Sequence, residues 1–296
     1  MTSELGRVAL VTNSDERYAD PEIHVLRQAL RDAAVVAEVV SWDDEVDWGA
    51  YTLVVVRTTW DYFDRLVEFA EWAMQVDKVT TLVNPADVIR WNSHKGYLVE
   101  MAVRGVPTVP TVLIPGQSMD VTDQLQETAW DEVVVKPAVD GGARGTYRGR
   151  RDDPATSATA ERLAAKGDVV VQPFVRGIAA GERSLVFMAG RLSHAVRKVP
   201  AAGDYRSQRH LGGTESDHTP DSAEVQVALA AMEVAPGRLS YARVDLVDWE
   251  GSPALMELEV IEPDLFFRGI AARHEAFVAM VQDELARVGD QVPQTR

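Results

Sequence analysis

The 296-residue chain contains no cysteine, which excludes disulfide bonds, thiolate metal sites and a catalytic cysteine. Positive charge is also scarce, because 30 Lys and Arg residues stand against 46 Asp and Glu residues and give a formal net charge of −16 at pH 7. A surface of this charge repels phosphate backbones, which argues against nucleic acid or an anionic membrane as a partner. A local basic pocket could still hold a small anion.

Long apolar runs are missing as well. The first apolar run, residues 8–12, is five residues long and is followed by polar residues, so it fits neither a signal peptide nor a membrane span. We therefore expect a cytoplasmic protein. Hydrophobic residues make up 46% of the chain, which is enough for a globular protein of two or three lobes.

The order of apolar patterns predicts two kinds of architecture along the chain. Residues up to 91 alternate short apolar strands with helical patterns, which is typical of an α/β layer with parallel strands. A further helix is expected over 92–104, and strands with glycine loops follow it in an α+β texture. Two hairpins are predicted, at 185–196 and 241–260, and the polar segments 151–166 and 214–224 are predicted to be surface loops or short exposed helices.

The second predicted hairpin concentrates carboxylates. Glu257 and Glu259 are two residues apart, so an extended chain points both to one face, and Asp245 lies on the preceding strand. Like charges this close require a cation, and all-oxygen ligands suit Mg²⁺, which often completes its shell with substrate phosphates. The alternative interpretation is a solvated edge strand.

Neither common phosphate-binding loop is present, because the sequence lacks G-x-x-x-x-G-K-[ST] and has no G-x-G-x-x-G after its first strand. A nucleotide would therefore be held in another way. Lys136 ends the strand VVVKP, the loop 140–145 (DGGARG) can turn its amides towards an anion, and Arg197 with Lys198 follows a strand.

In order and spacing, the chain from about residue 92 to 268 resembles the ATP-grasp superfamily of carboxylate ligases. The resemblance implies ATP and Mg²⁺ as cofactors and an ATP-grasp fold behind an N-terminal Rossmann-like domain. The implied domains are 1–91, 92–173 and 174–296, the last with the metal site. The implied ATP-binding residues are Lys95, Lys136, Gly141, Gly142, Gly145, the hinge residues Gln172, Pro173, Phe174 and Val175, and Glu182 at the ribose.

The same resemblance implies a catalytic loop and a metal set. The loop 206–213 (RSQRHLGG) is similar to the arginine-to-double-glycine loop of the ribosomal-protein glutamate ligases, in which the arginine faces phosphoryl transfer. Its candidate residues are Arg206, His210, Gly212 and Gly213, beside Lys198 and Arg197. The implied metal ligands are Asp245, Glu257 and Glu259. Most relatives have Asn at the last position, so direct or water-mediated ligation by Glu259 stays open.

A metal-bound ATP facing an arginine suits conversion of a carboxylate to an acyl phosphate, which a nitrogen then attacks. Over nearly its whole length, including VVVRTTWDY and MELEVIEPDLFF, the chain also resembles the O-ureido-serine cyclo-ligases of cycloserine biosynthesis. This implies ring closure within O-ureido-D-serine to give D-cycloserine. The alternatives are a ligase that joins two separate molecules and, less favoured, a non-catalytic nucleotide-binding protein.

The partner implied by this chemistry is a small amino acid, held between the N-terminal domain and the ATP-binding domains. The candidate substrate residues follow a buried strand and are Arg57, Thr58, Thr59 and Trp60. The competing interpretation makes Trp60 a packing anchor and places Arg57 in a structural salt bridge. A homo-oligomer, dimer or tetramer, is in keeping with the smaller members of the superfamily.

Overall fold

The computed structural model describes residues 6–291, and its first sheet is the parallel one predicted for the N-terminal segment. The strand order is β2-β1-β3-β4, with all neighbours parallel. The elements are β1 (Val8–Thr12), η1 (Glu16–Tyr18), α1 (Glu22–Asp32), β2 (Ala37–Ser41), η2 (Trp48–Ala50), β3 (Leu53–Thr58), η3 (Tyr62–Asp64), α2 (Leu66–Val79), β4 (Thr81–Val83) and α3 (Ala86–Asn92). Because helices cover both faces of the sheet, every residue of β3 is buried.

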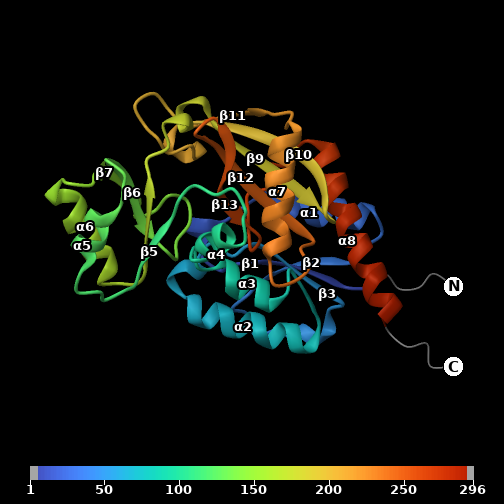
Figure 1. The fold of residues 1–296 in the computed structure, drawn as a ribbon. Helices are drawn as coiled ribbons and strands as arrows, with labels where there is room; N and C mark the ends of the chain where they lie inside the picture. Colours follow the sequence, from blue (N-terminus) through green and yellow to red (C-terminus); the bar gives the residue numbers. More distant parts are fainter. Residues whose placement is uncertain (1–5, 292–296) are drawn as a thin grey trace.

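A second, antiparallel sheet of order β5-β8-β6-β7 forms the lobe at the left of Figure 1. The chain enters it after α4 (Tyr97–Val103), which packs with the third sheet, and its elements are β5 (Val112–Ile114), α5 (Val121–Glu127), β6 (Glu132–Pro137), β7 (Tyr147–Arg150), α6 (Pro154–Ala164) and β8 (Val169–Pro173). The helix predicted over 92–104 is wrong in its bounds, since α3 ends at Asn92 and α4 starts at Tyr97. The segment 151–166, predicted to be a surface loop or a short exposed helix, contains the short helix α6, part of which is exposed while Ala160 and Leu163 are buried against this sheet.

The third sheet has the order β11-β10-β9-β12-β13 and is antiparallel throughout. Its segment contains η4 (Arg176–Ala180), β9 (Glu182–Met188), β10 (Arg191–Val199), η5 (Arg209–Leu211), β11 (Thr214–Asp217), α7 (Ser222–Val234), β12 (Tyr241–Trp249), β13 (Ser252–Glu259) and α8 (Ala271–Gln291). Both predicted hairpins are confirmed. Their two-residue turns, 189–190 and 250–251, have positive φ at both positions, as tight hairpins require.

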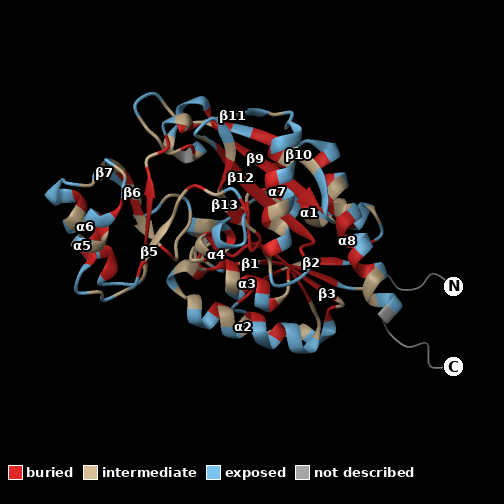
Figure 2. Cartoon of the chain, in the orientation of Figure 1, coloured by how far each residue is buried: buried red, intermediate tan, exposed pale blue. Residues whose placement is uncertain are grey.

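Buried polar groups connect the first sheet to the third. The Tyr241 hydroxyl on β12 donates to the carbonyls of Val56 (2.8 Å) and Ile261 (2.7 Å), and the Asn84 amide donates to the carbonyl of Val260 (2.8 Å). The strands form the buried interior, with the exposed surfaces of the helices outside (Figure 2). These buried hydrogen bonds fix the position of the first sheet relative to the third. No helix of the described part is long and apolar enough to cross a membrane.

Candidate active site

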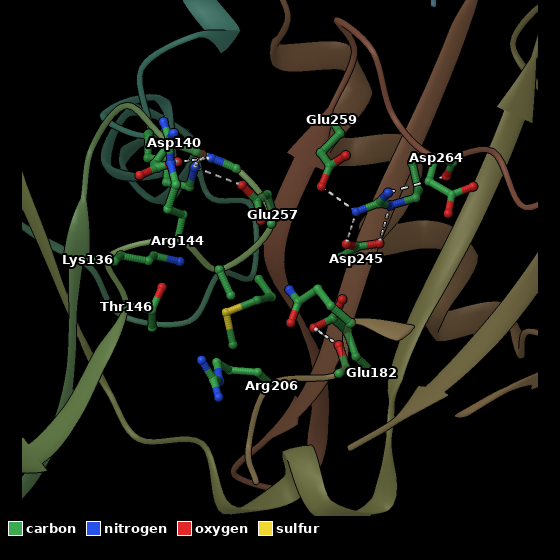
Figure 3. Close-up of a pocket in the computed structure, with 18 of the residues that line it drawn as sticks. Lys136, Asp140, Arg144, Thr146, Glu182, Arg206, Asp245, Glu257, Glu259 and Asp264 are labelled. Atoms are coloured by element: carbon green, nitrogen blue, oxygen red, sulfur yellow. Dashed lines mark hydrogen bonds and ion pairs between the residues drawn. The ribbon is translucent and has the colours of Figure 1, made fainter. Parts of the chain in front are cut away.

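A cavity of about 680 Å³ lies where segments from all three sheets meet. One wall is formed by the end of β6 and the glycine loop 140–145, and the facing wall by β12 and β13, so that Lys136 and Arg144 lie opposite Asp245 and Glu259 (Figure 3). The remaining wall comes from the N-terminal domain and from the residues after β13. The cavity thus gathers most of the residues that the sequence singled out.

The acidic hairpin has the predicted antiparallel register, with Asp245 opposite Glu257. Each of its carboxylates is already paired with a cation. Glu257 accepts from Lys95 (3.1 Å), while Asp245 accepts from Lys198 (3.0 Å) and from Arg243 (2.8 Å). Glu259 also pairs with Arg243. Within residues 6–291, no three acidic or histidine side chains are arranged to hold a metal, so protein cations supply part of the neutralisation that the sequence assigned to Mg²⁺.

The three carboxylates differ in their ionisation. Burial opposes ionisation of Asp245, but Arg243 and Lys198 outweigh it and hold its pKa well below the usual range. Lys95 and Lys136 do the same for Glu257, whose pKa is lowered despite burial. Burial raises the pKa of Glu259 to about 8, which Arg243 only partly offsets. Asp245 and Glu257 are therefore the carboxylates that are ionised and able to donate oxygen at neutral pH.

Lys136 lies half-buried at the inner end of β6 and faces the cavity. It makes no ion pair with any residue that the structure describes, and burial lowers its pKa below the usual value for lysine. In the break between α3 and α4, Lys95 donates to the carbonyl of Asp140 in the glycine loop as well as pairing with Glu257. An unpaired and a paired lysine thus share the side of the cavity that the sequence assigned to phosphates.

The glycine loop and the end of β8 complete this side of the cavity. Gly141 and Gly142 line it, and Gly141 lies so close to the Phe63 ring that a Cβ there would be 2.3 Å from a ring carbon. Gly145 lies outside the wall, against Pro137. The predicted hinge residues all line the cavity; they are Gln172, Pro173, Phe174 and Val175.

Only one member of the predicted Arg197–Lys198 pair reaches the cavity. Successive residues of a strand point to opposite faces, so Lys198 is buried in the wall while Arg197 is exposed and lies over Gly181. Lys198 bridges Asp245 and Glu182. The carboxylate predicted to contact ribose, Glu182, therefore holds a lysine in this structure, and burial raises its pKa in spite of that lysine.

The arginine loop contributes its first half to the cavity. Arg206 lines it and is anchored by Asp204, whose carboxylate accepts from Nη2 at 2.8 Å. Gly212 and Gly213 do not line it; a Cβ on Gly213 would be 2.3 Å from the carbonyl oxygen of Ser207, so the pair lets the loop fold back on itself. The side chain of His210 lies outside the described part of the structure.

The predicted substrate loop reaches the cavity only at Trp60. Arg57, a candidate substrate residue, does not line the cavity: it is buried and donates to the carbonyl of Pro263 (3.0 Å). Thr58 and Thr59 are buried with it, since β3 is covered on both faces. The Trp60 indole N–H donates to the carbonyl of Glu262 (3.1 Å).

The residues of the wall that the sequence interpretation missed include Arg243, Glu262, Arg17 and Tyr18. Arg243 could have been found, because it precedes Asp245 by two residues and so shares its strand face. Glu262 stood in the acidic stretch but had no role assigned. Arg17 and Tyr18 of η1 come from a distant loop whose composition gives no local signal.

Two family models match the chain: the ATP-grasp domain of prokaryotic glutathione synthetase over residues 101–265, and the N-terminal domain of D-cycloserine synthetase DcsG over residues 8–84. The cycloserine biosynthesis protein DcsG of Streptomyces lavendulae is 34% identical over 285 residues, which cover 88% of this chain and 93% of that protein. The chain belongs to the ATP-grasp ligase family.

Solved structures agree with this assignment. The crystal structure of D-cycloserine synthetase DcsG is 29% identical, with a TM-score of 0.84 over 95% of this chain and all of that one. D-alanine–D-alanine ligase from Bacillus anthracis, complexed with ATP, is 14% identical with a TM-score of 0.69 over 96% of this chain and 99% of that one, which supports the fold alone. ATP-grasp ligases in general use ATP and Mg²⁺, and this family member is an ATP-dependent carbon–nitrogen ligase.

Proposed function

We propose that the enzyme converts O-ureido-D-serine to D-cycloserine by activating its carboxylate with ATP and closing the ring within one molecule. The observation that carries the proposal is that the N-terminal domain forms the substrate side of the cavity. Trp60 and Tyr62 belong to the segment 8–84 that matches the N-terminal domain of D-cycloserine synthetase. The ATP-grasp segment is similar to ligases of different substrates and by itself favours none of them.

In this proposal the nucleotide occupies the side of the cavity formed by β6, the glycine loop and the end of β8. Lys136 is a cation without an ion pair in the described residues, and phosphate oxygens are the anions that would pair with it. Lys95 adds charge next to it and also fixes the carbonyl of Asp140 at the start of the glycine loop. Backbone groups of Phe174 and Val175 would contact the base where β8 ends.

Asp245 and Glu257 would hold Mg²⁺, because both are ionised oxygen donors and lie opposite each other in the hairpin. When bound, the ion would neutralise charge on the phosphate oxygens. Glu259 fits this task less well, since burial raises its pKa to about 8 and Arg243 already pairs with it.

The reacting carboxylate would lie between the nucleotide and Trp60, within reach of Arg206 and Arg243. Fixed positive groups of this kind stabilise charge that spreads over a transferred phosphoryl group. Ring closure then forms a bond between the ureido nitrogen and the carboxyl carbon as the bond from that carbon to phosphate breaks. Water then removes the carbamoyl group from the ring nitrogen: a bond forms from the water oxygen to the carbamoyl carbon, the ring nitrogen takes a proton, and the carbamic acid released decomposes to carbon dioxide and ammonia.

The acyl phosphate must be kept from water until the ring closes. Contacts between the glycine loop and the N-terminal domain cover the cavity for this purpose. Arg144 of the loop makes two hydrogen bonds to Asp64 (3.0 and 3.2 Å), and Gly141 packs on Phe63.

The test is ADP release and ring formation by the purified chain with ATP, Mg²⁺ and O-ureido-D-serine as the only amino acid. We expect ADP and D-cycloserine, identified by mass spectrometry, in a one-to-one ratio. A panel of other amino acids, each with and without an added amine, runs in parallel. ADP release that requires a second amine, with no ring product from O-ureido-D-serine, would replace the cyclo-ligase by an intermolecular ligase.

A further inference from the structure

Eight acidic side chains of the described residues line the cavity, and one of them differs from the rest because it has no ion pair. Seven form ion pairs with Lys or Arg: Asp140, Glu182, Glu215, Asp245, Glu257, Glu259 and Asp264. The eighth, Glu262, makes no ion pair with any side chain that the structure describes. Glu262 is only 8% exposed.

An unpaired carboxylate in such a place is costly, because burial disfavours the charged form unless a cation or hydrogen-bond donors compensate. Burial raises the pKa of Glu262 to about 7, and its own backbone amide and the charges of Arg243, Lys95 and Arg57 lower it only in part. The protein therefore leaves a carboxyl group at the cavity with no ion-pair partner among the described side chains, and a nearby cation would favour its ionised form. A cationic ligand group would supply the missing partner.

Glu262 lies on the substrate side of the cavity, where a hydrogen bond holds its backbone. Its carbonyl accepts from the Trp60 indole, which holds the aromatic ring and the segment after β13 together. Tyr62 lines the same region, and the negative charge of Glu262 acts on its hydroxyl. A carboxylate and aromatic rings that line the same part of a cavity suit an alkylammonium group, which can form an ion pair with the one and contact the faces of the others.

Arg57 is the competing internal partner, and the geometry argues against it. Its Nη2 donates to the Pro263 carbonyl, while its Nε and Nη1 have no partner in the described residues. Arg57 acts on Glu262 through its charge but forms no ion pair with it, and it does not line the cavity. A divalent metal is also disfavoured, since no further acidic or histidine group of the described chain joins Glu262 in a ligand set.

We propose that Glu262 binds the α-ammonium group of the amino-acid substrate, with Trp60 alongside it. The assignment rests on the proposed function and deepens it, because it names the group by which the enzyme selects an α-amino acid over other carboxylates. Glu262 is thus a specificity residue: it contacts the end of the substrate that does not react and orients the carboxylate towards the nucleotide.

The test compares two substrates on two enzymes. O-ureido-D-serine and 3-(ureidooxy)propanoic acid share the carboxylate and the ureido nitrogen and differ only in the amino group. A lost charge-assisted contact is worth about 1.5–3 kcal/mol, so kcat/KM of the wild type should favour the amino substrate by about 10- to 100-fold. In Glu262→Gln this preference should fall to about threefold or less, while KM for ATP stays at the wild-type value.

Two further variants keep the outcome interpretable. Glu215→Gln removes the same charge from a cavity carboxylate that is paired with Arg268, and it should retain the preference for the amino substrate. Glu262→Asp keeps the charge at a shorter reach and should retain part of the preference, which tests the proposal even if Glu262→Gln unfolds. Turnover of O-ureido-D-serine by Glu262→Gln with the full wild-type preference would overturn the assignment alone. No turnover of it by the wild type would overturn the proposed function, and the ammonium site with it.

Discussion

The two ends of the cavity are built from different parts of the chain and leave opposite charges without a protein partner. At the nucleotide end, Lys136 on β6 faces the cavity as an unpaired cation within the described residues. At the substrate end, Glu262 after β13 is an unpaired carboxylate. Between them the charges neutralise each other in pairs such as Lys95–Glu257 and Lys198–Asp245. Absence of a partner at a buried charge therefore marks a ligand contact better than charge alone does.

The ends also differ in what they share with other ligases. Lys136 belongs to the segment 101–265 that matches the glutathione synthetase ATP-grasp model, and Trp60 belongs to the segment 8–84 that matches the N-terminal domain of D-cycloserine synthetase. The nucleotide end is thus the general part of the site and the substrate end the selective part. Changes at each end should separate these two properties.

The largest effect is expected in the paired region between the ends, at Glu257. Glu257→Gln keeps the size of the side chain but removes a charge that Mg²⁺ needs, so kcat should fall by about 100- to 1000-fold. The added Mg²⁺ and ATP should raise the thermal unfolding temperature of the wild type more than that of the variant, which gives a readout apart from turnover. Glu132→Gln is the matched control, because Glu132 pairs with Arg148 and does not line the cavity. Turnover of Glu257→Gln near the wild-type rate would show that Glu257 does not hold the metal.

The second prediction concerns the substrate end, where Glu262 should make the free energy of unfolding depend on pH. The carboxyl group of Glu262 has its pKa raised from 4.5 to about 7, so without substrate the folded protein keeps a proton that the unfolded chain loses over this range. The free energy of unfolding of the wild type should therefore fall, relative to that of Glu262→Gln, as pH rises from about 5 to about 7, by about 3 kcal/mol at most. Well above pH 7 the difference should stay constant, because the carboxyl group is then ionised in both the folded and the unfolded state.

Urea denaturation of both proteins between pH 5.5 and 8 measures this difference. Glu215→Gln serves as the control, since its carboxylate is paired with Arg268 in the folded state. A difference that does not change with pH, or that favours the wild type as pH rises, would mean that Glu262 has a cationic partner inside the protein.

Much of the nucleotide end could be predicted from sequence because it depends on local order. The two-residue turn and the alternation along each strand predict the hairpin, but a register shift between Asp245 and Leu246 is what places Asp245 opposite Glu257. Lys136 could be placed because a strand rich in valine ends at it. The break at Lys95 could not be predicted: the helical pattern continues through residues 93–96, and the break forms because Asn92 and Tyr97 bond to the backbone of Leu258 on the edge of β13.

The substrate end depends on contacts between distant segments, which the sequence pattern does not reveal. Arg57 looked like a ligand because it is a cation at a strand end, but helices cover both faces of β3 and bury it. Glu262 looked like one of four similar carboxylates. Its distinction, the missing partner, appears only when the N-terminal domain packs on the third sheet and brings Trp60 against it.

The third effect separates two cations of the nucleotide end. Lys136→Met should weaken ATP binding by about 10- to 100-fold. The Lys136 ammonium is unpaired among the described residues and so is available to a phosphate oxygen, whereas methionine cannot make that contact. Arg206 lines the cavity and is anchored by Asp204; if it acts chiefly on the transferred phosphoryl group, as proposed, Arg206→Met should lower kcat while the Kd for ATP changes little. Calorimetric titration with a non-hydrolysable ATP analogue, together with steady-state kinetics, gives both quantities. An equal loss of ATP affinity in the two variants would contradict this division of roles.

The smallest effect is expected where the two ends are closed against each other, at the contact between Asp64 and Arg144. Both side chains are partly exposed, at 61% and 46%, so the pair is worth at most about 1 kcal/mol. Asp64→Asn should therefore leave substrate binding nearly unchanged and open the glycine loop about twofold to fivefold more often. Each opening admits water to the acyl phosphate, so the ratio of ADP released to D-cycloserine formed should rise above one. Glu68→Gln, on the next turn of the chain and paired with Arg65, should keep the ratio of the wild type. A ratio of one in Asp64→Asn would mean that the packing of Gly141 on Phe63, rather than the ion pair, keeps the two ends closed during the reaction.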